Sequence, residues 1–302
     1  MGISIEGTDN SDLLTGAGAD DTFDGGAGLD TLDYSVASQS GLAIMLDYSS
    51  DSVTTLQLMI NLATGTTCKL QGGLQIGVDT LRNLEGVIGG RWDDTMSGSA
   101  NDDVLDGQTG NDSVAGLGGA DLLLGGVGND SIDGGAGDDS MAGGSGNDVL
   151  NGGAGADHLL GDGGSDTLAD GAGDDVVDAG MGDDVLGNGL GSDVFVFGDN
   201  FGADSMNDAS AGDYIGHDVV KFSDSAAEEL FLVRQGNDLK IFNPASAASL
   251  MLIGWYGAAG DPAGVTHRHI DEFESFDGIV LLGTSTALLT LGGSMTAMTS
   301  MV

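Results

Sequence analysis

The chain has 302 residues and 40% hydrophobic content, enough for a sizeable core and one to three domains. Its 48 acidic residues against 7 basic ones leave a net charge of −41, which excludes nucleic acid and anionic membrane surfaces as natural partners. A compact state needs cationic compensation, from a polybasic partner or from divalent cations held by carboxylates. No uninterrupted apolar stretch is long enough to predict a membrane span, and the N-terminal MGISIEG does not read as a Sec-type signal peptide.

A short block of nine-residue repeats occupies residues 1–33. Its three units begin at Gly7, Gly16 and Gly25, and each has Asp at the sixth position and Leu or Phe at the eighth. The sixth-position residues are Asp12, Asp21 and Asp30. Residues 34–88 then break the period, and we treat them as an interruption within one continuous solenoid.

The main repeat runs from Gly89 to Val196 as twelve nonapeptides without an insertion or deletion. Position 8 is always apolar, and position 4 is Gly in ten of the twelve units. Position 6 is always Asp, namely Asp94, Asp103, Asp112, Asp121, Asp130, Asp139, Asp148, Asp157, Asp166, Asp175, Asp184 and Asp193. A Gly/Asp-rich disordered linker is the alternative, but a linker has no reason to keep Asp and an apolar residue in phase over this length.

Each unit is expected to form a turn of about six residues and a strand of about three, because Gly adopts positive φ freely and lets backbone carbonyls converge. Two units then make one coil of 18 residues whose position-8 side chain points inward, and coils stack at about 4.8 Å. A turn therefore lies over the turn 18 residues later. This sorts the carboxylates into two ladders, one on each edge, which contain Asp94 and Asp103 as their first members.

Stacked carboxylates repel one another unless a cation lies between them. Asp oxygens and Gly-loop carbonyls form an all-oxygen ligand set, which favours Ca²⁺ over zinc and magnesium. Five gaps on each edge predict about ten calcium ions in this block. The carbonyl candidates are at position 4 and are Gly110, Gly119, Gly128, Gly137, Gly146, Gly155, Gly164 and Gly173. Glycine runs such as GLGGADLLLGG do not predict a phosphate site, because they lack a βαβ context and lie among carboxylates.

Units such as GGVGNDSID and GGSGNDVLN match the RTX, or haemolysin-type, calcium-binding repeat at every position. YSVASQSGLAIML, INLATGTT, DTLRNLEGVIGG and SDVFVFG follow in the order seen in the C-terminal β-roll of serralysin-type proteases. This resemblance implies an all-β fold, a calcium-bound parallel β-roll (an RTX solenoid) over residues 89–196. It also implies longer strands over 34–88 that extend the roll, and a β-rich C-terminal cap over 197–302.

The resemblance also concerns export. RTX proteins leave the cell through type I secretion machinery by an uncleaved C-terminal signal, and the tail LLGTSTALLTLGGSMTAMTSMV is similar to one; the alternative is a final strand or frayed terminus. The expected location is therefore extracellular or at the cell surface. HExxH and GxSxG are both absent from the sequence, so neither a zinc protease nor a lipase is predicted, and we expect no enzyme activity.

A few residues outside the ladders invite other readings. His267, His269 and Asp271 are candidate transition-metal ligands if they share a strand face, although exposed polar alternation gives the same pattern. His158 is expected to face solvent. Trp92 replaces a position-4 Gly and is expected to cap the first coil, with sugar stacking as the alternative. Trp255 and Tyr256 are expected in the core or a cap rather than in a ligand platform.

Three functions are compatible with a chain in which the recognisable motifs are all structural repeats. The first is a structural protein of the bacterial exterior, such as a surface layer, filament or matrix component, that self-assembles into homo-oligomers or polymers. The second is a calcium-dependent adhesin or module that binds cell-surface polysaccharide. The third is a polysaccharide lyase, an epimerase or an enzyme accessory whose active carboxylates the sequence conceals.

Overall fold

The computed structural model describes strands and the turns between them, with no helix among the described residues. The described residues are 4–6, 13–14, 22–24, 31–33, 56–61, 66–71, 74–82, 86–89, 93–198, 201–208, 217–223, 230–235, 238–245, 248–253, 270–274 and 280–282. The chain divides into two compact units, Met1–Val149 and Leu150–Val302, and each is described by itself. In the part of the chain that is described, no helix is long and apolar enough to cross a membrane.

The first unit begins with short strands that already show the 18-residue coil. These strands are β1 (Ser4–Glu6), β2 (Leu13–Leu14), β3 (Thr22–Asp24) and β4 (Thr31–Asp33). β1 pairs with β3 and β2 with β4, both parallel and both offset by 18 residues, as in Ser4 opposite Thr22. The described strands of residues 1–33 therefore pair at the same 18-residue spacing as those of the main block.

Longer strands follow and join this block to the main repeat. β5 (Leu56–Asn61), β6 (Thr66–Gln71) and β7 (Leu74–Arg82) form an antiparallel meander, and β8 (Gly86–Ile88) follows. β7 pairs with β3 and β5 pairs with β9 of the main block, both parallel. β8 lies between β4 and β10. The interrupting segment thus inserts strands into both sheets of the roll without ending them.

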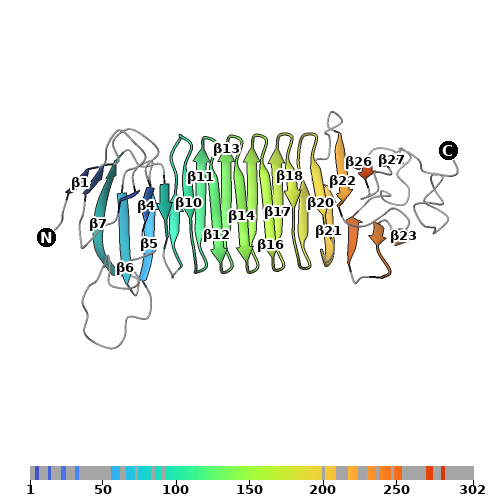
Figure 1. The fold of residues 1–302 in the computed structure, drawn as a ribbon, viewed down its shortest axis with the longest axis horizontal. Helices are drawn as coiled ribbons and strands as arrows, with labels where there is room; N and C mark the ends of the chain where they lie inside the picture. The colour runs from blue at the N-terminus through green and yellow to red at the C-terminus, as the bar shows by residue number, and fades with distance from the viewer. Residues whose placement is uncertain are drawn as a thin grey trace. The chain divides into compact units, whose positions relative to one another are not determined.

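The main repeat of the first unit alternates between two parallel sheets (Figure 1). Its strands are β9 (Thr95–Ser97), β10 (Val104–Asp106), β11 (Ser113–Gly118), β12 (Leu122–Val127), β13 (Ser131–Ala136) and β14 (Ser140–Ser145). β9, β11 and β13 pair in one sheet, and β10, β12 and β14 in the other. Residues 18 apart stand opposite each other, as Val114 does to Ile132. β15 (Val149–Ala154) contains the boundary between the units.

The second unit continues the same alternation and then changes to antiparallel pairing. One sheet contains, in parallel pairing, β16 (His158–Gly163), β18 (Val176–Asp178), β20 (Val194–Phe197) and β22 (Asp218–Phe222). The other sheet contains, also in parallel pairing, β17 (Thr167–Ala172), β19 (Val185–Asn188) and β21 (Ala203–Asp208). β25 (Ser249–Ile253) and β26 (Ile270–Glu274) add parallel to β21 and β22. β23 (Phe231–Gln235) pairs antiparallel with β24 (Asp238–Phe242), which pairs antiparallel with β25, and β27 (Val280–Leu282) pairs antiparallel with β26.

The nonapeptide is divided differently from the sequence expectation of a six-residue turn and a three-residue strand. β11 to β14 each have six residues, covering positions 7 to 9 of one unit and positions 1 to 3 of the next. Between these strands the turn is therefore only positions 4 to 6, whereas β9, β10 and β18 have the expected three residues. The six-residue strands are longer because the residues at positions 2 and 3 still pair with the next coil, as Leu117 and Gly118 do with Gly135 and Ala136.

The core consists of the position-8 side chains, as the sequence predicts. All twelve of them, from Met96 to Phe195, are at most 1% exposed. In the second unit, Phe197, Phe201 and Phe222 form an aromatic cluster with ring centroids 5.1 to 6.1 Å apart. One inward side chain from each strand thus fills a narrow space between the two sheets, which leaves the turns to hold the polar groups.

Candidate metal sites in the turns

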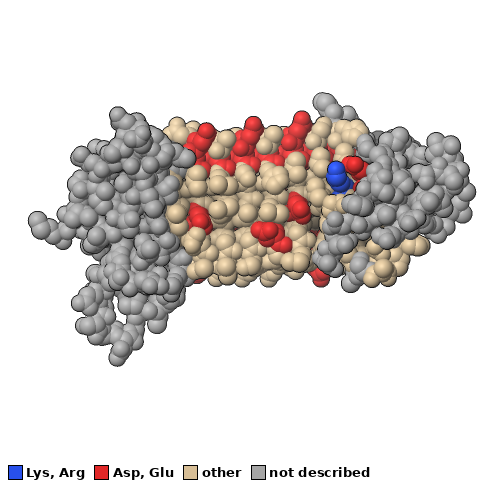
Figure 2. Space-filling model, viewed as in Figure 1, with Lys and Arg blue, Asp and Glu red and all other residues tan. Residues whose placement is uncertain are grey.

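The turns bring one carboxylate from each nonapeptide into a buried row. All twelve position-6 Asp side chains are at most 3% exposed, although acidic side chains are almost never fully buried without a partner. On the face shown in Figure 2, acidic side chains lie along the upper edge of the described strands and in separate patches across the middle. The predicted ladders therefore exist as rows of buried carboxylates within each unit.

Glycine at position 4 makes the tight turn possible. Gly128 has φ +147°, and a Cβ there would collide with the carbonyl oxygen of Gly110 in the previous coil. Gly146 and Gly128 repeat the relationship, as do Gly137 and Gly119. The position-4 carbonyl thus points along the stack into the space between turns, which only a residue without a side chain leaves open.

In most ladder carboxylates one oxygen, Oδ1, joins two successive coils; Asp103 at the start of its ladder differs, because its Oδ2, and not its Oδ1, accepts a hydrogen bond, from the Ser99 N–H. In the first unit, Asp94, Asp112 and Asp130 donate their backbone N–H groups to Oδ1 of the Asp 18 residues later, at 2.7 to 2.8 Å. Asp103 and Asp121 do the same on the other ladder at 2.8 Å. In the second unit, the Asp157, Asp166 and Asp175 N–H groups donate to Asp175, Asp184 and Asp193. Oδ1 is therefore a structural acceptor.

The second oxygen, Oδ2, has no such role. In Asp112, Asp121 and Asp130 of the first unit it is buried and receives no hydrogen bond, and the same holds for Asp175 and Asp184 of the second. A buried polar atom left unsatisfied costs about 1 to 3 kcal/mol, and more when it is charged. A repeated row of such atoms indicates that a ligand satisfies them.

The surroundings of Oδ2 are those of a cation cradle. A Cβ placed on Gly125 would lie 2.6 Å from Oδ2 of Asp130 and 2.7 Å from the carbonyl oxygen of Gly143. A Cβ placed on Gly98, Gly143 or Gly152 would likewise lie 2.6 Å from Oδ2 of the position-6 Asp in the same nonapeptide. Position 1 thus lies directly against a carboxylate oxygen and, at Gly125, against a carbonyl oxygen of the next coil. Hard oxygen donors of this kind suit Ca²⁺.

Burial makes these carboxylates poor acids in the metal-free state. Desolvation raises the pKa of Asp112 to about 7 and that of Asp121 and Asp130 to about 6, with the neighbouring ladder carboxylates contributing. Desolvation likewise raises the pKa of Asp175 to about 7 and of Asp204 to about 8. Hydrogen bonds from the backbone oppose the rise without cancelling it. Near neutral pH, protons and metal ions therefore compete for the ladder carboxylates.

The structure describes some of the other predicted site residues and not the rest. The eight position-4 glycines from Gly110 to Gly173 all have positive φ, between +116° and +149°. His158 is exposed, as expected. Asp12, Asp21 and Asp30, the candidate ligands His267 and His269, and the aromatic residues Trp92, Trp255 and Tyr256 lie outside the described residues. Only the backbone of Asp271 is described.

Both ladders extend beyond the strict repeat. The Asp184 N–H donates to Oδ1 of Asp204 at 2.9 Å, and the Asp193 N–H donates to Oδ1 of Asp218 at 3.0 Å. These spacings are 20 and 25 residues, so the nine-residue period could not reveal them. The sequence also did not identify Asp170, which lies with Asp175 and Asp193 in a group of three buried carboxylates. Its signal was an Asp at position 1, where Gly is usual.

A second row at position 5 was also missed. The backbone N–H of Asn129 donates to Oδ1 of Asn111 at 2.8 Å, and that of Asn147 donates to Oδ1 of Asn129 at 2.7 Å. Asp93 and Asp102 accept in the same way. The direction is opposite to that of position 6, because here the later coil donates. Asp, Asn or Ser at position 5 in ten of twelve units was the available signal.

The repeat segments match a known family of calcium-binding repeats. The model of the RTX calcium-binding nonapeptide repeat matches residues 4–34, 88–123, 115–150, 124–159, 133–168 and 160–195. Repeats of this family bind calcium and are typical of secreted proteins. No curated protein matches the chain. Among solved structures, the extracellular lipase LipA from Serratia marcescens is similar at 20% identity, over 65% of this chain and 39% of the lipase, with a TM-score of 0.23.

Proposed function

We propose that this chain, whose repeat segments belong to the RTX calcium-binding family, is a secreted structural protein of the bacterial exterior that folds when it binds calcium and then assembles. In this role it is a surface-layer, filament or matrix component and not an enzyme. Type I export would carry the chain unfolded from a low-calcium cytosol, and external calcium would fold it.

The observation that carries the proposal is the repeated buried Oδ2 atom without a hydrogen-bond donor, as in Asp112, Asp121 and Asp130. Without a cation, these atoms must be protonated or the turns must open, because an uncompensated buried charge is costly. The glycine-rich turns also lose much conformational entropy on ordering. Calcium binding would supply the free energy for both, so the roll is coupled to the ion.

The ligands within this chain each have a part in binding. Asp Oδ2 atoms would supply negative charge, the glycine carbonyls would supply neutral oxygens, and Oδ1 would hold each carboxylate in place through the backbone N–H of the adjacent coil. Calcium, when bound, supplies the positive charge between coils. About ten ions in the main block would offset about 20 of the 41 negative charges.

Exposed aliphatic side chains support the assembly step. Leu122 and Val127 of β12 are 40% and 56% exposed, and Met181 and Leu190 of the second unit are 63% and 50% exposed. Such contacts remain weak while the subunits repel each other through their net charge. Calcium reduces that repulsion, so apolar contact between copies becomes favourable only after the monomer has folded.

The test is to measure secondary structure and particle size of the full chain in EGTA and in millimolar calcium. Circular dichroism is expected to show little β structure in EGTA and full β structure in calcium, and light scattering to show oligomers at high protein concentration. Equal β content in both conditions would overturn calcium-coupled folding. A strict monomer that binds a glycan saturably would replace assembly with adhesion, and turnover of an alginate-like polymer would replace it with catalysis.

A further inference from the structure

The glycine at position 1 is replaced in the last three units of the main repeat. The first nine units have Gly there, from Gly89 to Gly161, whereas the last three have Asp170, Ala179 and Asn188. Where Gly is present, a Cβ would come close to the ladder carboxylate of the same unit, as at Gly152, where it would lie 2.6 Å from Oδ2 of Asp157. A side chain at position 1 is therefore directed at the metal cradle.

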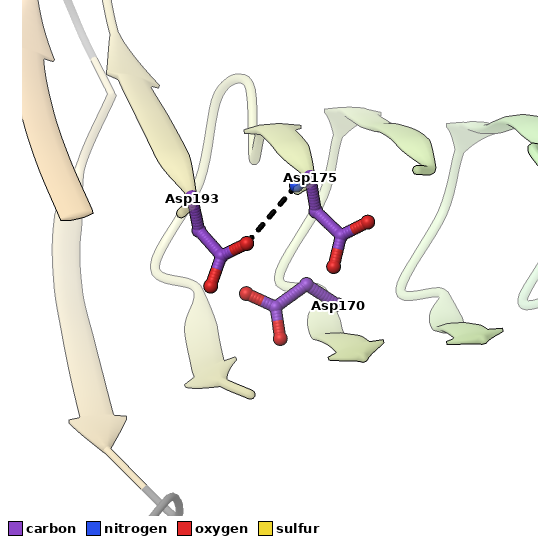
Figure 3. A group of neighbouring side chains, drawn as sticks. All are labelled: Asp170, Asp175 and Asp193. Atoms are coloured by element: carbon purple, nitrogen blue, oxygen red, sulfur yellow. Dashed lines mark hydrogen bonds between the residues drawn. The ribbon is translucent and has the colours of Figure 1, made fainter. Parts of the chain in front are cut away.

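Asp170 places a carboxylate in that cradle. Asp170 and Asp175 are 1% exposed and Asp193 is 0% exposed, and one oxygen from each of the three lies within 4.8 Å of the others. Figure 3 shows Asp170 directed toward the carboxylate of Asp193, which itself accepts a hydrogen bond from the Asp175 backbone N–H at 3.0 Å. Asp170 comes from β17, and Asp175 and Asp193 come from two successive turns of one ladder.

Two of the oxygens in this group have no hydrogen-bond donor. Oδ1 of Asp170 accepts from the Gly171 N–H at 2.7 Å, which fixes the side chain, but its Oδ2 is buried and receives no hydrogen bond. Oδ2 of Asp175 is in the same condition. Asn188, at position 1 of the next unit on this edge, instead donates Nδ2 to Oδ2 of Asp218 at 2.9 Å. The amide adds no charge there, so the extra carboxylate is confined to the turns of Asp175 and Asp193.

We propose that Asp170, Asp175 and Asp193 form a three-carboxylate cation site that binds calcium more tightly than the two-carboxylate gaps of the ladder and fills first. The inference rests on the proposed calcium-coupled folding and adds an order of filling to it. A third carboxylate adds one negative charge within contact distance of the ion in a site shielded from water, where Coulomb attraction is strongest. The chain would then begin to fold at the C-terminal part of the repeat.

The test is a calcium titration of the full-length chain by isothermal calorimetry, with a competing chelator to resolve the tightest ion. Wild type is expected to bind one ion at least roughly tenfold more tightly than the rest, or about 1.4 kcal/mol. Asp170→Gly restores the repeat glycine, and Asp170→Asn keeps the size while removing the charge. Both are expected to lose that tight ion while still folding in excess calcium.

Asp162→Gly is the matched control, because Asp162 is exposed, has φ +68° and stands at position 2, where Gly is the most frequent residue. It removes one charge outside the group and should keep the tight ion. A tightest-site affinity that is equal within about twofold in wild type, Asp170→Gly and Asp170→Asn would overturn the proposal, since it would mean that the Asp170 carboxylate does not bind the ion. A wild-type chain that neither folds with nor binds calcium would instead refute the proposed function.

Discussion

The backbone N–H of Asp112 donates to Oδ1 of Asp130 at 2.7 Å, whereas Oδ2 of Asp130 is buried without a donor. One side chain therefore has two roles, because one oxygen sets the stacking of coils and the other lies against Gly125, at the expected metal site. Removing the carboxylate would damage coil stacking and ion binding together.

Asp121→Ala should lower the calcium-loaded stability by about 2 to 4 kcal/mol, because it removes the acceptor for the Asp103 N–H and one buried ion ligand. Urea unfolding in excess calcium would measure it. Asp133→Ala removes an exposed carboxylate from β13 and should change stability by less than about 0.5 kcal/mol. Equal losses in the two variants would contradict the ladder's role.

Substituting an Asp at the end of a ladder should reduce calcium cooperativity and stability less than substituting an interior one. By the 18-residue period Asp139 is an interior member of its ladder, whereas Asp94 belongs to the first nonapeptide of the main repeat. Asp139→Ala should therefore weaken calcium cooperativity and stability more than Asp94→Ala. Calcium titrations followed by circular dichroism would compare their Hill coefficients, and identical curves would count against stacked sites.

Acid should stabilise the metal-free roll. The folded-state pKa values of Asp112, at about 7, and of Asp121 and Asp130, at about 6, lie above the ordinary value of 3.8. Their favourable contribution is complete below about pH 4 and is lost as pH rises through 6 to 7. In EGTA, β content by circular dichroism should be greater near pH 4 than near pH 8. No change, or the reverse order, would contradict the burial of these groups.

The calcium-loaded roll should respond to pH in the opposite direction. Protons and calcium compete for the same Oδ2 atoms, so the calcium concentration at half-folding should rise as pH falls below about 6. A titration at several pH values would measure the shift. A constant midpoint would show that the ladder carboxylates are not the ligands.

Two glycines of one nonapeptide should differ sharply in their tolerance of alanine. Gly182 has φ +143°, and a Cβ there would collide with the Gly164 carbonyl oxygen, so Gly182→Ala should cost about 2 kcal/mol or more. Gly187 has no atom closer than 3.8 Å to its Cβ position, so Gly187→Ala should be nearly neutral. Thermal unfolding in calcium would compare them, and a neutral Gly182→Ala would refute the turn geometry.

The sequence determined the features that repeat locally. A strict period of nine placed an apolar residue such as Leu123 inward and an Asp such as Asp130 in a turn, and the 18-residue coil follows because two strands are needed to enclose a core. The oxygen-rich turns and their preference for calcium were likewise predictable, since residue type and spacing alone define them.

The tertiary structure decided what depends on neighbours at irregular spacing. Asp204 and Asp218 join the ladders because β21 and β22 pair with the last repeat strands, whatever the length of the loops before them. Asp170 meets Asp193 only because one coil stacks on the next. The extent of the strands also depended on stacking, since the pairing of Gly118 with Ala136 makes a glycine-rich stretch part of the sheet. Contacts of this kind are set by which segment lies on the adjacent coil, and a one-dimensional pattern does not contain that information once its period is broken.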